Sequence, residues 1–278
     1  MPLSGRVWFI TGASRGLGAE FALAALAAGN SVAASARDAA ALATLAAEGG
    51  ERLLRLEVDV TDRSAVFAGV EQTVERFGRI DVAVNNAGYG LHGAVEELRA
   101  DELRSQLETN LFGALWVIQA VMPVMRRQRS GHIVNVSSIA GGVGFPFVGA
   151  YSASKFALEG LSECLALEAA AFGVKVTILE PSDFRTGFMR ACIKRTAPIP
   201  EYEQTFADLL ARMSPENSGS EAGDPERAAA ALLALVDDPQ PPLRHVLGNR
   251  AFDRLTQHHR LQLDEWAAQE QTARGADF

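Results

Sequence analysis

The feature that most constrains the fold is the regular alternation of short apolar runs with longer helical patterns up to about residue 180. The runs are almost continuously apolar, which is typical of strands buried on both faces of a parallel sheet. We predict strands at 6–11, 31–37, 53–58, 80–85, 132–137, 174–180 and 243–247. Helices are predicted at 16–28, 39–48, 63–77, 100–125 (one helix or two), 150–172, 201–213, 225–236 and 249–271. This order favours an α/β fold with a doubly wound sheet.

The alternation stops after residue 180. Between 181 and 224 the chain has four prolines and a polar stretch, and we predict only the helix at 201–213 there, with no strand. A connection of this length is usually a functional lid or disordered. We expect a substrate lid at about 182–224 and, because no linker or repeat separates a second unit, a single domain over 1–278.

Composition narrows the classes of partner. The net charge of −8 gives no global field that attracts nucleic acid or an anionic membrane, so neither is expected as a partner and any anion site must be local. The N-terminus shows no signal-peptide pattern, and the two cysteines lie far apart, which favours the reducing cytoplasm. Adjacent His258 and His259 point in different directions on a helix, so no metal site is predicted.

The first predicted strand runs into a glycine-rich motif at which the first helix begins. The motif reads Thr11-Gly12-Ala13-Ser14-Arg15-Gly16-Leu17-Gly18. Glycines permit a tight turn and close approach of a phosphate, and a helix N-terminus offers unpaired N–H groups and a positive dipole end. Between a strand and a helix, the motif predicts a dinucleotide site formed by Gly12, Ser14, Arg15, Gly16, Leu17 and Gly18.

The end of the second predicted strand favours NADP(H) as the cofactor. An acidic residue there would bind a ribose 2′-hydroxyl, whereas a 2′-phosphate requires arginine. The sequence reads Ser35-Ala36-Arg37, with no carboxylate before Asp38. Arg15 and Arg37 are therefore expected to bind the 2′-phosphate through charge-assisted hydrogen bonds.

Candidate chemical groups follow the fourth and fifth strands, at the edge where open α/β sheets bind ligands. They are Asn85-Asn86-Ala87-Gly88 and Asn135-Val136-Ser137-Ser138, and Tyr151-Ser152-Ala153-Ser154-Lys155 comes downstream. Positions i and i+4 share a helix face, so Tyr151 and Lys155 are expected side by side. The ammonium should lower the pKa of the phenol toward a useful acid–base range.

Together these motifs resemble the short-chain dehydrogenase/reductase superfamily, in its single-domain branch, over residues 6 to about 187. The resemblance rests on the glycine motif, Asn86-Ala87-Gly88, Ser138 thirteen residues before Tyr151, and Lys155 four residues after it. It implies a seven-stranded sheet in the order 3-2-1-4-5-6-7.

The resemblance also implies a role for each site residue. Tyr151 would be the general acid–base, Lys155 would lower its pKa and hold the nicotinamide ribose hydroxyls, and Ser138 would bind the substrate carbonyl oxygen. Asn110 would hold a water in the proton relay. Asp59 and Val60 would contact adenine, and Asn86, Ala87 and Gly88 would line the adenine-ribose side. Pro181 is followed by Ser182 instead of the usual glycine, which weakens the carboxamide contacts assigned to Phe184 and Thr186.

The loops at 89–93 and 139–148 should border the nicotinamide end, together with apolar residues of the lid. The residues expected to touch substrate are His92, Val143, Phe145, Phe188 and Met189. Their character predicts a largely apolar pocket for a medium-sized ketone, aldehyde or secondary alcohol.

Two other functions remain open. A non-catalytic NADP(H)-binding regulatory protein is disfavoured by the intact Asn110, Ser138, Tyr151 and Lys155. Dehydratase or epimerase chemistry is possible on the same scaffold, because fold alone does not determine function. Apolar residues on more than one face at 111–125 and 153–167 predict a homodimer or homotetramer, as the resemblance also does.

Overall fold

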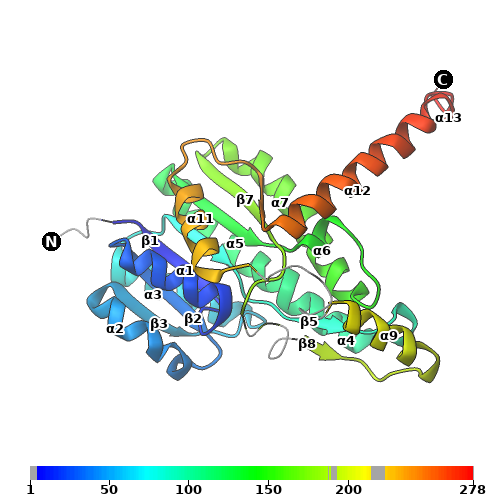
Figure 1. The fold of residues 1–278 in the computed structure, drawn as a ribbon. Helices are drawn as coiled ribbons and strands as arrows, with labels where there is room; N and C mark the ends of the chain where they lie inside the picture. Colours follow the sequence, from blue (N-terminus) through cyan, green and yellow to red (C-terminus); the bar gives the residue numbers. More distant parts are fainter. Residues whose placement is uncertain (1–4, 187, 189–192, 214–222, 278) are drawn as a thin grey trace.

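The computed structural model describes residues 5–186, 188, 193–213 and 223–277, and it has a parallel seven-stranded sheet at its centre (Figure 1). The strands are β1 Val7–Thr11, β2 Ser31–Ala36, β3 Leu53–Glu57, β4 Val82–Asn85, β6 Gly131–Val136, β7 Val174–Pro181 and β9 Arg244–Leu247. Their order in the sheet is β3-β2-β1-β4-β6-β7-β9. Counted along the chain, this is the predicted order 3-2-1-4-5-6-7, so the predicted fold class is confirmed.

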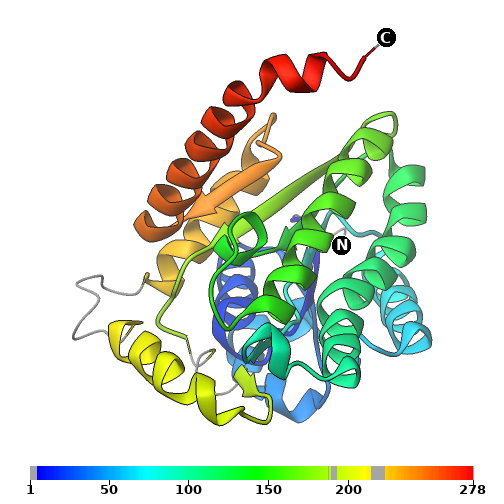
Figure 2. The ribbon, with the colours of Figure 1, turned by 90° about the vertical axis from the view of Figure 1, so that its right-hand side faces the viewer.

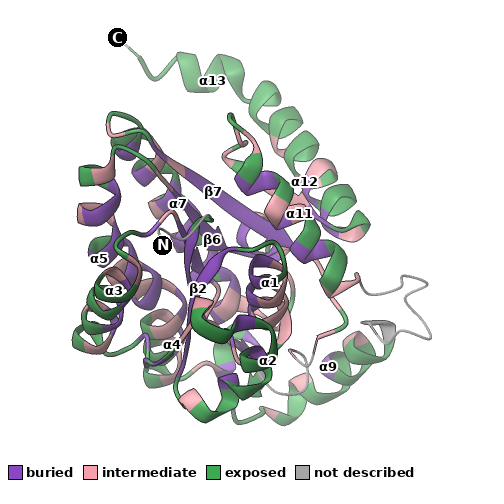
Figure 3. Cartoon of the chain, turned by 90° about the vertical axis from the view of Figure 1, so that its left-hand side faces the viewer, coloured by how far each residue is buried: buried purple, intermediate pink, exposed green. Residues whose placement is uncertain are grey.

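Helices cover both faces of the sheet. α1 Gly16–Ala27 and α11 Pro225–Asp237 pack on one face, and α3 Arg63–Phe77, α5 Gly113–Gln128 and α7 Gly149–Ala170 pack on the other. Successive strand residues point to opposite faces, so Trp8 and Ile10 join the first core and Phe9 joins the second. The strands are consequently buried on both sides (Figure 3), as their continuous apolar runs predict.

Two predicted helices have a different form. The 39–48 segment is a 3₁₀ helix η1 Ala39–Leu45, which is followed by α2 Ala46–Gly49 and by a further 3₁₀ turn, η2 Gly50–Arg52. The 100–125 segment is continuous helix to residue 128, in which the π-helical turn η4 Glu108–Phe112 joins α4 Ala100–Leu107 to α5. By length and composition alone, this helix is long and apolar enough to cross a membrane. One such helix is weak evidence for a membrane span, because core helices pass the same test, and 44% of its most apolar stretch is buried inside the protein.

The lid contains a strand, so the prediction of a strandless segment is wrong. β8 Ile193–Arg195 pairs in parallel with β5 Gly90–His92. Both strands have only three residues, too few to show an apolar pattern. The lid continues into α9 Pro200–Met213, at the predicted position (Figure 2). Residues 187, 189–192 and 214–222 of the predicted lid lie outside the described residues.

Hydrogen bonds fix the described part of the lid to the segment after β5. That segment includes the 3₁₀ turn η3 Val95–Glu97. The Ile199 N–H donates to Glu97 Oε1 at 2.8 Å, and Thr196 Oγ1 donates to Glu102 Oε2 at 2.6 Å. This part of the lid and the segment after β5 are therefore held together by hydrogen bonds.

The predicted C-terminal helix is two helices, α12 Asn249–Ala268 and α13 Glu270–Arg274. Ala251 and Leu255 are buried against the body, and the rest of α12 extends away from it (Figure 1). The start of α12 packs near α6 Ile139–Gly142, because a Cβ on Gly142 would lie 2.4 Å from Leu255 Cδ2. The first turns of α12 thus border the loop that follows β6.

Candidate active site

One cavity of about 1150 Å³ lies at the carboxyl ends of the strands and brings together nearly all of the predicted site residues. Those that line it are Gly12, Ser14, Arg15, Gly16, Leu17, Arg37, Asp59, Val60, Asn86, Ala87, Gly88, His92, Ser138, Val143, Phe145, Tyr151, Lys155, Pro181, Phe184, Thr186 and Phe188. Gly18 and Asn110 do not line it, although both contact residues that do. Met189 lies outside the described residues.

Two glycines of the loop, Gly12 and Gly18, have no room for a side chain. Gly12 and Gly16 have φ values of +64° and +59°, the left-handed region that favours glycine. A Cβ on Gly12 would lie 2.9 Å from Ala87 Cα, and one on Gly18 would lie 2.3 Å from Asn86 Nδ2. The motif therefore forms a tight turn that opens the N-terminus of α1 to the cavity.

Asn86 holds this turn in place from the neighbouring strand end. Its Nδ2 donates to the carbonyls of Thr11 and Gly12 at 3.0 and 3.1 Å. In return, Thr11 Oγ1 accepts the backbone N–H groups of Asn86 and Ala87, both at 3.1 Å. Asn86 is thus a structural support of the glycine loop as well as part of the cavity wall.

The end of β2 is followed by a positive charge, and no carboxylate of the described residues forms an ion pair with it. Ala36 ends the strand and lines the cavity, while Asp38 turns back to accept the Ala40 N–H at 2.8 Å. Arg15 and Arg37 are exposed, line the cavity, and form no ion pair with the described residues. Asp59, on the loop after β3, also lines the cavity and accepts the backbone N–H of Thr61 at 2.9 Å.

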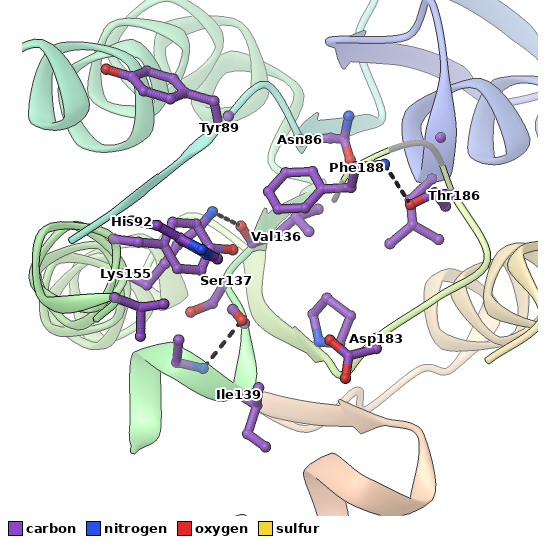
Figure 4. Close-up of a pocket in the computed structure, with 18 of the residues that line it drawn as sticks. Asn86, Tyr89, His92, Val136, Ser137, Ile139, Lys155, Asp183, Thr186 and Phe188 are labelled. Carbon is purple, nitrogen blue, oxygen red and sulfur yellow. Dashed lines mark hydrogen bonds between the residues drawn. The ribbon is translucent and has the colours of Figure 1, made fainter. Parts of the chain in front are cut away.

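Ser138, Tyr151 and Lys155 all line the cavity, and Figure 4 shows the hydrogen bond from Lys155 to Val136. Tyr151 and Lys155 are one turn apart on α7, and Lys155 Nζ lies 5.7 Å from the Tyr151 ring centroid. This ammonium is buried and donates to the Val136 carbonyl at 2.7 Å. Ser138 lies beside Tyr151, and its Oγ accepts the Ala140 N–H at 3.1 Å. The predicted juxtaposition is therefore present.

The predicted lowering of the Tyr151 pKa is wrong, because the pKa is raised. Burial raises the pKa of Tyr151 to about 12, and the nearby Asp183 raises it further, against the opposing effect of the Ser138 hydrogen bond. Burial also lowers the pKa of Lys155 to about 8. Removing both groups from water penalises their charged forms more than the ammonium favours the phenolate. The phenol consequently keeps its proton, the form that a proton donor requires.

Asn110 lies in the π-helical turn η4 and is buried behind the cavity wall. Its Nδ2 donates to the Tyr89 carbonyl at 2.9 Å and to Ser154 Oγ at 3.0 Å, and its Oδ1 accepts the Tyr89 N–H at 3.1 Å. Both amide hydrogens are used. A water held at Asn110 would therefore have to donate to one of its oxygens.

Replacement of the usual glycine by Ser182 is accommodated locally. Ser182 is not among the described non-glycine residues with positive φ. Its side chain faces Gly248, where a Cβ would lie 2.3 Å from Ser182 Oγ. The chain beyond it continues along the cavity: Phe184 packs against the core, and the side chain of Thr186 lies 3.5 Å from the Cβ position of Gly16.

A buried acidic cluster behind the catalytic corner was missed in the sequence. Glu159 Oε1 accepts a hydrogen bond from Ser137 Oγ at 2.6 Å, and Arg244 of β9 lies 3.2 Å from Glu159 and 3.9 Å from Glu180. Burial and the charge of Glu159 raise the pKa of Glu180 to about 7. The sequence signal that could have indicated this cluster is the position of Glu159, which lies one turn after Lys155 on the same helix face.

One wall of the remaining part of the cavity is apolar. Phe147 and Phe206 pack edge-to-face at 5.1 Å, Phe206 contacts the ring of His92, and Phe188 lies 6.3 Å from the Tyr151 ring. Burial and the charge of Arg195 lower the pKa of His92, so this histidine is neutral at pH 7.

The sequence did not predict that residues of α12 also line the cavity. Among the described residues, no group of three or more His, Cys, Asp or Glu is arranged to hold a metal ion.

Comparison with known proteins agrees with this geometry. The family model described as short chain dehydrogenase matches residues 6–196. The chain is 42% identical over 252 residues to oxidoreductase BOA17 of Botryotinia fuckeliana, covering 89% of this chain and 90% of that protein. It is also 42% identical over 195 residues to a 3-ketodihydrosphingosine reductase of Bacteroides thetaiotaomicron, covering 69% and 72%.

A solved structure extends the match to the whole fold. A short-chain dehydrogenase from Streptomyces avermitilis superposes with a TM-score of 0.91 at 40% identity, covering 99% of both chains. Family model, relatives and structure agree on one class of protein. The chain therefore belongs to the short-chain dehydrogenase family, and it is an oxidoreductase of the kind that acts on CH–OH and C=O groups.

Proposed function

We propose that this protein is an NADPH-dependent carbonyl reductase, working in reverse as an alcohol dehydrogenase, on a medium-sized and largely apolar ketone or aldehyde. The observation that carries the proposal is the meeting of Ser138, Tyr151 and Lys155 in one corner of a cavity that also contains the glycine loop. At about 1150 Å³ the cavity exceeds the range of about 300–1,000 Å³ that is usual for one small ligand. It has room for a cofactor and a substrate.

The nucleotide end fits NADP(H) better than NAD(H). The glycine turn and the open N-terminus of α1 suit a pyrophosphate. Ala36 offers a 2′-hydroxyl no acceptor, while Arg15 and Arg37 stand at the same end without carboxylate partners among the described residues. When bound, NADPH supplies the hydride for reduction.

The side chains then manage the charge that develops on the substrate oxygen. Ser138 and Tyr151 lie side by side at the cavity, so a carbonyl oxygen placed between them would accept from both hydroxyls. Tyr151 is the proton donor, since its raised pKa keeps it protonated until the oxygen becomes a stronger base. Lys155, held by the Val136 carbonyl, places its positive charge beside the tyrosinate that remains after the proton is donated.

Substrate selection is assigned to the apolar region formed by the loops after β4 and β6 and by α9. Val143, Phe145 and Phe188, with neutral His92, would contact the body of the substrate. A ketone with an aromatic or aliphatic body buries apolar surface there, at about 25 cal/mol per Å² removed from water.

The proposal is tested by NADPH oxidation with a panel of aliphatic, aromatic and polycyclic ketones and aldehydes. The loss of reduced-nicotinamide absorbance is followed, and the alcohol products are identified. Turnover of carbonyl compounds with NADPH preferred over NADH is expected. Tight NADPH binding with no turnover across the panel would instead favour a regulatory nucleotide-binding protein. Conversion of hydroxy compounds without net NADPH consumption would favour dehydratase or epimerase chemistry.

A further inference from the structure

Two helices of different character line the substrate end of the cavity. α9 contributes Phe206, Leu209 and Leu210, whereas α12 contributes Arg250, Arg254, Gln257, His258 and Leu261. The two helices lie apart, with the loop after β6 between them (Figure 2). One wall of the opening is therefore apolar and the other is polar and basic.

The basic residues of α12 share one helix face and line the same cavity as Ser138, Tyr151 and Lys155. Arg250, Arg254 and His258 follow each other at intervals of four residues, which aligns them along the helix. Leu255, beside Arg254, packs against Gly142, which is four residues after Ser138. A group bound at this face and a carbonyl at Ser138 would therefore share one cavity.

The charge of the lining opposes that of the whole protein. The chain has a net charge of −8, yet six Lys or Arg and only three Asp or Glu line the cavity. At the substrate end, Arg250 is paired with Asp183, and the Lys194 ammonium lies 4.4 Å from the centroid of the Tyr89 ring. Arg254 forms no hydrogen bond or ion pair with any described residue. Within the described part of the chain, no carboxylate pairs with this charge where it lines the cavity.

We propose that the preferred substrate is an apolar keto acid, whose carboxylate is bound by Arg254, with His258 beside it, while its carbonyl meets Ser138 and Tyr151. The apolar residues of α9 would take the body between these two ends. The inference rests on the proposed carbonyl-reductase function. It makes Arg254 a specificity-determining residue on an element that is remote in sequence from every catalytic motif.

The test compares two ketones that differ in one group, an aryl keto acid and its methyl ester, under identical conditions. The readout is the ratio of kcat/KM for the acid to that for the ester. In the unmodified protein we expect this ratio to exceed one at low salt and to fall as salt is raised, because exposed charges are screened. Arg254→Ala should lower the ratio about two- to fivefold, the range measured for exposed ion pairs, and Arg254→Glu should lower it further.

Arg260→Ala is the matched control, since Arg260 is an exposed arginine of the same helix that does not line the cavity. It should leave the ratio unchanged. An ester preferred over the acid, or a ratio that Arg254→Glu does not change while both ketones are reduced, overturns the inference alone. Absence of turnover for every ketone overturns the proposed function, and the inference with it.

Discussion

Glu180 gives the most specific prediction about stability. It lies at the end of β7, is 1% exposed, and its Oε1 has no hydrogen-bond partner among the described residues. The guanidinium of Arg244 lies 3.9 Å away, and Glu159 adds a second negative charge nearby. These surroundings raise the pKa of Glu180 from 4.5 to about 7. The folded protein therefore retains a proton that the unfolded chain would release.

The sign and size of the effect follow from this difference. Because the folded pKa is the higher one, the contribution of Glu180 to stability is complete below pH 4.5 and is lost as the pH rises through 7. At about 1.4 kcal/mol per pH unit, the rise from 4.5 to about 7 amounts to about 3 kcal/mol. Glu180→Gln removes the ionisation and keeps the shape. It should therefore be more stable than the parent at pH 8, relative to pH 5, by up to about 3 kcal/mol.

Urea unfolding of parent and variant at pH 5, 6, 7 and 8 measures this difference. The gap in unfolding free energy should open between pH 5 and 8, with several degrees of difference in Tm at the upper end. Glu163→Gln is the control, because Glu163 also pairs with Arg244 but is half exposed. Parallel stability curves for parent and Glu180→Gln would refute the assignment of a buried, destabilising charge.

Three further predictions concern the cofactor, the catalytic corner and association. Arg37→Ala should weaken NADPH binding about ten- to more than a hundredfold, because one charged hydrogen-bond partner is lost, and should leave the affinity for NADH almost unchanged. Equal affinities of the parent for both cofactors would contradict this prediction. Lys155→Ala should lower both turnover and cofactor affinity, whereas Ser138→Ala should lower turnover about 10²–10³-fold with near-normal affinity, as measured by kinetics and cofactor fluorescence. Light scattering at micromolar concentration should show a dimer or tetramer, and a monomer would refute that expectation.

Most of the fold was predictable because its signals are local. Continuous apolar runs identify strands buried on both faces, and residues such as Trp8 and Phe9 confirm that both faces are used. The candidate catalytic residues were also found from a local signal, since Ser138, Tyr151 and Lys155 have a characteristic spacing along the chain. Strand order and the meeting of these residues came from the family resemblance, which local patterns alone do not supply.

What was missed depends on contacts between distant segments. β8 has three residues and forms only because β5 lies beside it. The raised pKa of Tyr151 reflects burial, which the spacing of tyrosine and lysine does not reveal. Arg244 meets Glu159 across 85 residues of sequence, and the basic face of α12 reaches the cavity only because Leu255 packs on the loop after Ser138.

The central claim, that Tyr151 donates the proton, is tested most directly by single-turnover NADPH oxidation in Tyr151→Phe, with cofactor binding measured by fluorescence. The substitution removes one hydroxyl, so the fold and NADPH affinity should be retained. General acid catalysis contributes about 10²–10⁴-fold, and reduction should slow by at least the lower factor. Normal NADPH binding with substrate reduction near the parent rate would show that Tyr151 is not the acid.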